Sequence, residues 1–146
     1  MQIEIKIDSS AKEPKVIVFT DKMTDEISEL VKKLSAETPS MIAGFRNSEV
    51  ILLEQTNIIR IYAADSKVYA ETESGEYQLR LRLYELEMRL EKNQFVRISN
   101  SEIVNLKKVK GFDLSFTGTI CVSLLNGTTT YVSRRYVTKI KQVLGI

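Results

Sequence analysis

The sequence predicts a mainly β protein with short helices, of the α+β class. Most of the chain after residue 40 consists of short runs rich in β-branched and aromatic residues. Turn-forming residues separate these runs, most clearly Asn126-Gly127, and the apolar spacing of a helix recurs only in short segments. Short strands joined by turns, with few helices, indicate a core built on small β-sheets.

The chain is expected to form two units. Its 146 residues suffice for one domain, or for one domain with a small appendage. The polar segment 35–40 contains one of the two prolines and separates two different patterns. We therefore expect an N-terminal unit at residues 1–38 and a main domain at residues 41–146.

The N-terminal unit is predicted as strand, strand and helix. Apolar and polar residues alternate over 2–8, and a more apolar run follows at 15–20. A helix is expected over 24–35, with Thr24 as its cap and one apolar stripe formed by Ile27, Leu30, Val31 and Leu34. Such a β-β-α unit is too small to be stable alone, so the stripe should pack on the main domain or on a second subunit.

The main domain is predicted as short strands joined by tight turns. One hairpin is expected about Ser74-Gly75. Another is expected about Asn126-Gly127, where both residues tolerate positive φ and favour a two-residue turn of the primed type. The expected strands are 49–53, 58–63, 67–73, 76–82, 95–98, 108–113, 119–125 and 128–132.

The main domain should also contain two short helices and one isolated helical turn. The first helix is predicted over 83–91 and the isolated turn over 101–105. The last helix is predicted over 134–143, with Ser133 as its cap and Gly145 just past its end.

The composition argues against catalysis and against metal binding. The sequence has no histidine, which excludes Ser-His-Asp and Cys-His catalysis and histidine-based zinc sites. Cys121 is the single cysteine, so neither an internal disulfide nor a cysteine-rich metal cage is expected. The glycines are scattered and form no phosphate loop. We therefore expect no enzyme, no metal and no cofactor.

The chain is also expected not to be inserted in a membrane. No apolar run approaches the length of a membrane span, and the charged N-terminus is unlike a signal peptide. A lone cysteine fits a reducing compartment, so we expect a cytoplasmic protein.

The net charge of +2 hides an asymmetry along the chain. Residues 97–146 contain eight basic and two acidic residues, whereas residues 1–96 have a net charge of −4. A basic third of a near-neutral protein indicates a polyanionic partner such as nucleic acid. A solvated surface with an uneven charge count is the alternative.

Two segments contain groups suited to nucleic acid. Ser99-Asn100-Ser101 follows a strand and could donate to phosphate oxygens or read adenine through its amide, although the same residues are good helix starters. Arg134 and Arg135 lie in the first turn of a helix, where the dipole prefers anions, so a phosphate or guanine partner would explain them. An ordinary exposed helix remains the alternative.

These segments carry a resemblance to a known family. FVRISNSEIVNLKKV at 95–109, LNG at 125–127 and VSRRY at 132–136 resemble the LytTR-type DNA-binding domain of many bacterial response regulators. The resemblance extends over about 41–146, with matching order and spacing. The extension at 1–38 is similar to that of short LytTR regulators without a receiver domain. Ser99 departs from the family, which often has histidine there.

The resemblance implies an elongated fold of small β-sheets whose loops enter the major groove. Three loops would reach the DNA, at 64–67, 99–101 and 133–135, although Asp65 in the first loop would repel phosphate. Asn100 and Arg135 would read bases. The full set of expected DNA-binding residues is Asn100, Arg135, Arg134, Ser101, Arg97, Lys67, Lys107 and Lys139.

We therefore expect a sequence-specific DNA-binding transcription regulator. The resemblance implies double-stranded DNA with direct repeats as its target and a membrane-protein antagonist as a possible partner. Residues 1–38 would form a homodimer or simply cover an edge of the main domain. The competing hypothesis is a non-catalytic protein-interaction module, which explains the apolar helix stripe but not the basic C-terminal third.

Overall fold

The computed structural model describes residues 1–35, 41–115 and 117–146. The chain divides into two compact units, Met1–Thr38 and Pro39–Ile146. The boundary segment predicted at 35–40 lies, apart from residue 35, outside the described residues. The two units are described separately below.

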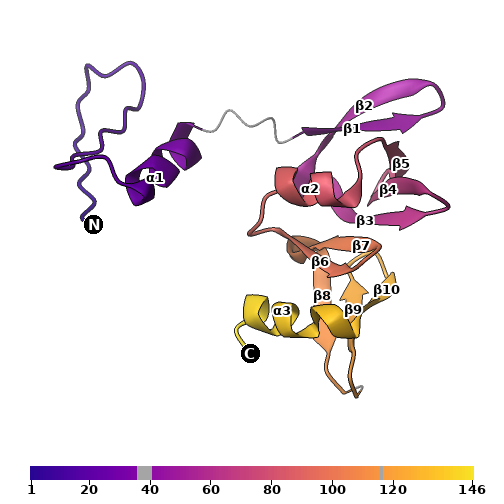
Figure 1. The fold of residues 1–146 in the computed structure, drawn as a ribbon. Coiled ribbons are helices and arrows are strands. Elements are labelled where there is room, and N and C mark those ends of the chain that lie inside the picture. The colour runs from indigo at the N-terminus through magenta and orange to yellow at the C-terminus, as the bar shows by residue number, and fades with distance from the viewer. Residues whose placement is uncertain (36–40, 116) are drawn as a thin grey trace. The chain divides into compact units, whose positions relative to one another are not determined.

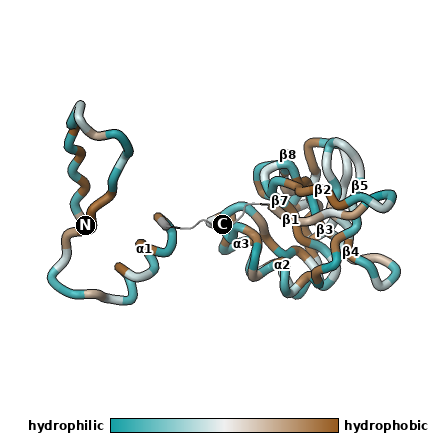
Figure 2. The backbone as a smooth tube through the Cα atoms, turned by 90° about the horizontal axis from the view of Figure 1, so that it is seen from above, coloured by the Kyte–Doolittle hydropathy of each residue, from teal (hydrophilic) through white to brown (hydrophobic). Residues whose placement is uncertain are grey.

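The described part of the N-terminal unit, residues 1–35, contains one helix, α1 (Asp25–Ser35). The predicted cap is confirmed, because Thr24 Oγ1 accepts a hydrogen bond of 3.2 Å from the backbone N–H of Ile27. The strands predicted at 2–8 and 15–20 are wrong: neither segment forms a strand, and Phe19 is fully exposed. Figure 2 shows hydrophobic and hydrophilic residues alternating along this part of the chain. Alternation alone does not stabilise an isolated strand pair, which needs a face to pack on.

The main unit is built on two antiparallel sheets (Figure 1). The larger sheet has seven strands in the order β2-β1-β5-β4-β3-β7-β6, and the smaller has three in the order β10-β9-β8. The larger sheet consists of β1 (Met41–Arg46), β2 (Glu49–Glu54), β3 (Ile58–Ala64), β4 (Lys67–Thr72), β5 (Gly75–Leu79), β6 (Phe95–Ser99) and β7 (Glu102–Asn105). The smaller consists of β8 (Val109–Asp113), β9 (Ile120–Leu124) and β10 (Thr129–Val132).

Four short helical segments complete the main unit as far as it is described, over 41–115 and 117–146. The helices are α2 (Leu83–Arg89) and α3 (Arg134–Leu144), and the single 3₁₀ turns are η1 (Gln55–Asn57) and η2 (Leu106–Lys108). The mainly β fold with short helices is confirmed. No helix among the described residues is long and apolar enough to cross a lipid bilayer.

The structure corrects the predicted helical turn at 101–105, because Glu102–Asn105 forms the strand β7. This strand pairs with β3 on one side and with β6 on the other, and all four of its residues are buried. Ile103 and Val104 are β-branched and fit the interior of a sheet well. The neighbouring strands therefore override the capping tendency of the preceding serines. Strand β1 was not predicted.

The turns also differ from their predicted types. Asn126-Gly127 lies in a hairpin, but the register places Leu125, Asn126 and Gly127 in a three-residue loop with positive φ only at the glycine. Two-residue turns with positive φ at both positions occur instead at Asn47-Ser48 and Asp65-Ser66, the pattern of primed hairpin turns. The β4–β5 turn is Glu73-Ser74, one residue earlier than predicted.

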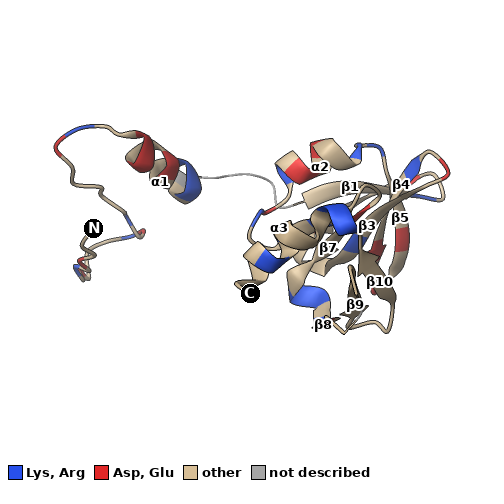
Figure 3. Ribbon diagram, turned by 60° about the horizontal axis from the view of Figure 1, so that its bottom comes forward, with Lys and Arg blue, Asp and Glu red and all other residues tan. Residues whose placement is uncertain are grey.

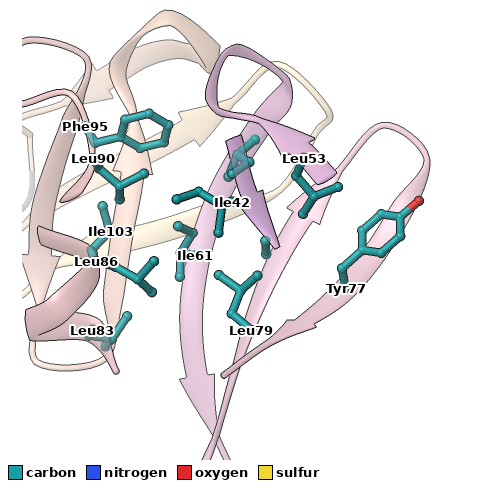
Figure 4. Close-up of a cluster of buried hydrophobic side chains, with 12 residues drawn as sticks. Ile42, Leu53, Ile61, Tyr77, Leu79, Leu83, Leu86, Leu90, Phe95 and Ile103 are labelled. Atoms are coloured by element: carbon teal, nitrogen blue, oxygen red, sulfur yellow. The ribbon is translucent and has the colours of Figure 1, made fainter. Parts of the chain in front are cut away.

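Two hydrophobic cores lie on the sheets. In the first, Leu83 and Leu86 of α2 face Ile61 and Leu79 of the larger sheet (Figure 4). In the second, Ile140 of α3 packs with side chains of β6, β7 and the smaller sheet, which include Val96, Ile98, Val104, Ile120, Val122, Leu124 and Val132. Strands β6 and β7 contribute to both cores, which explains why β7 is buried on both faces.

A polar cluster connects the two sheets. Arg60 Nε donates to Glu71 Oε2 over 2.8 Å, and Arg60 Nη1 lies 3.5 Å from Glu102 Oε1. The β9–β10 hairpin adds Asn126, which donates to Glu71, and Thr130, whose hydroxyl donates to Glu102 Oε1 over 2.8 Å. The hairpin of the smaller sheet is thereby fastened to β3, β4 and β7 of the larger one.

Strand β2 forms one edge of the larger sheet and pairs only with β1. Val50 and Leu52 on this strand are 61% and 65% exposed. Glu49 and Glu54 occupy its two ends, and both are exposed.

Candidate nucleic-acid interface

Two of the three predicted loops lie side by side at one end of the larger sheet. Strand β3 leads into the Asp65-Ser66 turn, and β6 leads into the turn at Asn100-Ser101. Tyr62 of β3 pairs with Glu102 of β7. The backbone N–H of Ala63 donates to the carbonyl of Ser101 over 2.8 Å. The β3–β4 and β6–β7 turns are therefore neighbours.

The third predicted loop, at the start of α3, meets the second. The backbone N–H of Ser133 donates to the carbonyl of Ile98 over 2.9 Å, which attaches the β10–α3 junction to the end of β6. One helical turn later, the Tyr136 hydroxyl donates to Asn100 Oδ1 over 3.2 Å. The fold thus brings together, at one end, three loops that are far apart in the sequence.

The turn that presents Asn100 is braced from inside the protein by Arg97. The Arg97 guanidinium donates to the carbonyl of Ser99 over 2.8 Å and to that of Asn100 over 2.5 Å. Its Nη1 also pairs with Glu87 Oε2 of α2 over 2.8 Å, and its side chain is only 13% exposed. Three of the five N–H groups of Arg97 are therefore engaged within the protein.

Helix α3 has a buried face and a basic exposed face. Ile140 is fully buried, and Tyr136, Val137 and Leu144 pack in part against the same core. Arg134, Arg135 and Lys139 are exposed, and Figure 3 shows basic residues along this helix. The Arg134 guanidinium lies against Gly118 in the loop before β9. Ser133 occupies the cap position, but its side chain makes no capping hydrogen bond.

A basic pair lies beside the β3–β4 turn. Lys67 begins β4 and is exposed, and the pairing of Val68 with Leu79 places Arg80 next to it. The Arg80 guanidinium stacks 4.0 Å above the Phe45 ring centroid. In the described part of the chain, neither Lys67 nor Arg80 forms an ion pair. Arg80 was not predicted as a site residue, although it continues the outward-facing alternation of β5.

Lys107 is not brought to these turns. It lies in η2 and follows the opposite end of β7 from Ser101. Its backbone N–H donates to Asn105 Oδ1, and its side chain is exposed. A strand of four residues spans about 13 Å, so Lys107 is separated from the three turns by roughly that length.

The arrangement can be compared with known proteins. The LytTr DNA-binding domain family matches residues 48–145 of this chain. The chain belongs to the LytTR family. The DNA-binding function that the family resemblance implied is therefore confirmed, as is the β-rich fold.

Relatives of this LytTR chain include transcription regulators. The chain is 30% identical over its whole length to an uncharacterized HTH-type transcriptional regulator of Staphylococcus aureus strain NCTC 8325 / PS 47, and covers 99% of that protein. A relative of the same description in strain MRSA252 is 29% identical with the same coverage. A solved LytTr DNA-binding domain from Bacillus cereus is 26% identical and has a TM-score of 0.71, with 73% of this chain and 98% of that one covered.

The helices of this LytTR domain are not arranged as a helix-turn-helix. Five strands, β6 to β10, separate α2 from α3, so no two helices of the described main unit are joined by a short turn. Tyr136, which contacts Asn100, was missed as a site residue, although it ends the VSRRY motif.

Proposed function

We propose that this protein regulates transcription by recognising a specific duplex sequence in the major groove through its three gathered turns. The observation that supports the proposal is the set of hydrogen bonds that join Ala63 to Ser101, Ser133 to Ile98 and Tyr136 to Asn100. These bonds hold donor-rich turns from distant parts of the chain on one end of a rigid sheet. A rigid set of donors is what sequence recognition on DNA requires.

Asn100 and Arg135 are the proposed base-reading residues. Both are exposed, and they lie in the turn and in the helix that the Tyr136–Asn100 hydrogen bond connects. An asparagine amide can bind adenine through two hydrogen bonds, and a guanidinium can bind guanine in the same way.

The remaining cations and hydroxyls are proposed to contact phosphates. Lys67, Ser101, Arg134 and Lys139 are exposed at or next to the three turns, and we add Arg80 because it extends this group beside Lys67. Arg97 and Lys107 complete the set. Arg97 retains two N–H groups for a phosphate, because two of its others donate to the turn and one to Glu87. Lys107 would contact the backbone farther along the duplex.

Selection of bound duplexes from a random pool tests the proposal directly. The full chain should enrich one sequence. Arg135→Ala and Asn100→Ala should each weaken binding to it by about 1–3 kcal/mol and relax the preference at one base pair. An enriched pool without any common sequence would contradict sequence-specific recognition.

The proposal also concerns the arrangement of the DNA target, self-association of the protein and a regulatory partner. We propose direct repeats as the target, bound by a homodimer in a bacterial cytoplasm, with a membrane-protein antagonist as a regulator. Exposed apolar side chains in the N-terminal unit support self-association, among them Ile3, Ile7 and Phe19, at 86%, 93% and 100% exposure. Deletion of residues 1–38 should convert the dimer to a monomer, as judged from the mass in solution. An unchanged oligomeric state would remove the dimer proposal.

A protein-interaction module is the second candidate function. The exposed apolar side chains of edge strand β2 favour it, because such an edge can accept a strand from a partner. A mobility-shift assay with the selected duplex at two salt concentrations separates the two functions, since only DNA binding weakens steeply with salt.

A further inference from the structure

The side chain of Asn100 is exposed, yet its amide makes a specific contact. Its amide oxygen Oδ1 accepts a hydrogen bond of 3.2 Å from the hydroxyl of Tyr136. The backbone beneath it is held by Arg97, which donates to the carbonyls of Ser99 and Asn100. With the backbone fixed, the remaining freedom of Asn100 is rotation of its side chain, and the Tyr136 contact restricts that rotation.

Tyr136 is itself held in place. It lies in the first turn of α3 and is half-buried, with its ring packed against the second hydrophobic core. The backbone N–H of Tyr136 donates to the carbonyl of Ser133 over 2.9 Å. The hydroxyl that reaches Asn100 is therefore presented by a packed ring on a helix rather than by a mobile surface side chain.

The contact matters because the two ends of an asparagine amide are chemically different. To bind adenine, Oδ1 must accept from the N6 amino group while Nδ2 donates to N7. A rotation of the amide by 180° exchanges the acceptor and the donor and presents the wrong pattern to that base. A carbonyl oxygen has two lone pairs, so Oδ1 can accept from Tyr136 and from a base at once.

We propose that Tyr136 is a positioning residue for specificity: its hydroxyl orients the Asn100 amide so that the amide discriminates between bases. The inference rests on the proposed function, since it concerns the base that Asn100 reads. Tyr136 acts through Asn100 and contributes no charge to the interface. Its loss changes the preference for one base pair and leaves the dependence of binding on salt unchanged.

Tyr136→Phe in the full chain tests the proposal, because it removes only the hydroxyl and keeps the packed ring. The probe is the duplex that the wild-type chain selects, together with duplexes changed at each base pair in turn. At the base pair read by Asn100, the ratio of affinities for preferred and changed duplexes should fall about three- to tenfold. Ratios at other positions and the salt slope should not change.

Two controls make the test specific. Tyr131→Phe removes a hydroxyl from a 56% exposed tyrosine of β10 that has no hydrogen-bond partner among the described residues, so it should leave every ratio unchanged. In an Asn100→Ala background, Tyr136→Phe should have no further effect on the ratio, because the group that it orients is gone. A further loss in that background would overturn the positioning role.

A second measurement needs no DNA. In amide NMR spectra of the free protein, Tyr136→Phe should move the Asn100 side-chain NH₂ resonances, and Tyr131→Phe should not. Unmoved resonances, or a uniform loss of affinity for all duplexes, would overturn the proposal. A wild-type chain that selects no duplex, in which Tyr136→Phe still moves these resonances, would refute the proposed function while keeping the contact.

Discussion

Asn105 shows how a single buried side chain holds the strands that present the turns. It is fully buried, its Nδ2 donates to the carbonyl of Ile58 over 2.7 Å, and its Oδ1 accepts from the backbone N–H of Lys107 over 3.0 Å. The side chain thus joins the end of β7 to the start of β3 and closes η2. Without Asn105 both backbone groups would lose this partner, and the carbonyl of the fully buried Ile58 would lose it away from water.

Asn105→Ala should therefore lower the free energy of unfolding by about 2–3 kcal/mol, because it leaves these backbone groups unsatisfied. The measurement is chemical denaturation followed by circular dichroism. Asn93→Ala is the matched control: Asn93 is exposed, so its variant should stay within about 0.5 kcal/mol of wild type. Equal stability of the two variants would contradict this role of Asn105.

Glu71 and Glu102 share Arg60 but have pKa values shifted in opposite directions. Burial raises the pKa of Glu71, but hydrogen bonds from Arg60, Asn126 and Thr128 more than offset it, so the pKa is lowered from its ordinary 4.5. Burial raises the pKa of Glu102, and hydrogen bonds from Thr130 and Arg60 offset this only in part. Glu102 Oε2 is buried without a hydrogen-bond partner, which explains the difference.

The sign of the Glu71 shift predicts a pH dependence. A carboxylate whose pKa is lowered in the folded state stabilises the fold above pH 4.5. This contribution is lost as the pH falls through the pKa of the folded state. Glu71→Gln should lower the free energy of unfolding by about 1–3 kcal/mol at neutral pH, because it removes the charged bonds to Arg60. Denaturation at several pH values should show the difference from wild type shrinking below pH 4.5. A difference that is constant with pH would contradict the assigned cause.

At the scale of elements, the packing of β1 depends on Gly44. A Cβ atom at Gly44 would lie 2.8 Å from Leu53 Cδ1 and 2.9 Å from Tyr77 Cβ, closer than real Cβ contacts allow. The absence of a side chain at Gly44 lets β1 lie tightly against the side chains of β2 and β5.

Gly44→Ala should accordingly destabilise the protein by about 1–3 kcal/mol through overpacking. Gly111→Ala in β8 is the control, since a Cβ there would meet no atom within 4 Å. Thermal unfolding of both variants checks the prediction, and a Gly44→Ala protein as stable as the Gly111→Ala protein would contradict it.

Elements with a strong local pattern could be predicted from the sequence, and elements defined by their neighbours could not. The leucine spacing of α2 and the Ser133 and Gly145 boundaries of α3 are local signals, and the structure confirms them. Strand β7 follows residues that favour a cap, and it is a strand because it pairs with β3, which is distant in sequence, and with β6. The strands expected near Ile3 and Val16 show the reverse case, in which an alternating pattern has no partner sheet.

For the molecule as a whole, the sequence indicated which loops are candidates for contacting DNA but not how they are held together. Motif resemblance singled out the turns at Asn100 and Arg135, while the bonds from Tyr136 and from Arg97 depend on tertiary structure. Arg80 could not be identified as a candidate site residue from the sequence, because its neighbour Lys67 lies on another strand. Contacts between side chains from separate elements have no local sequence signal.

Salt dependence tests the charge distribution of the whole main unit. Lys67→Ala and Arg80→Ala should each lower the slope of log affinity against log salt by about one, because each removes one phosphate contact. Lys92→Ala is the control: Lys92 is exposed and precedes β6, at the end of the sheet opposite Asn100. Fluorescence anisotropy with the selected duplex gives the slopes, and equal slopes for all three variants would contradict the proposed surface.

The edge strand β2 has a consequence for solubility. An antiparallel pairing of β2 with the same strand of another molecule, in matched register, would place Glu49 of one copy opposite Glu54 of the other at both ends of the ladder. Like charges facing each other across a sheet are unfavourable, so these two glutamates act as gatekeepers against edge-to-edge polymerisation. This repulsion disfavours fibre growth through the edge that exposes Val50 and Leu52.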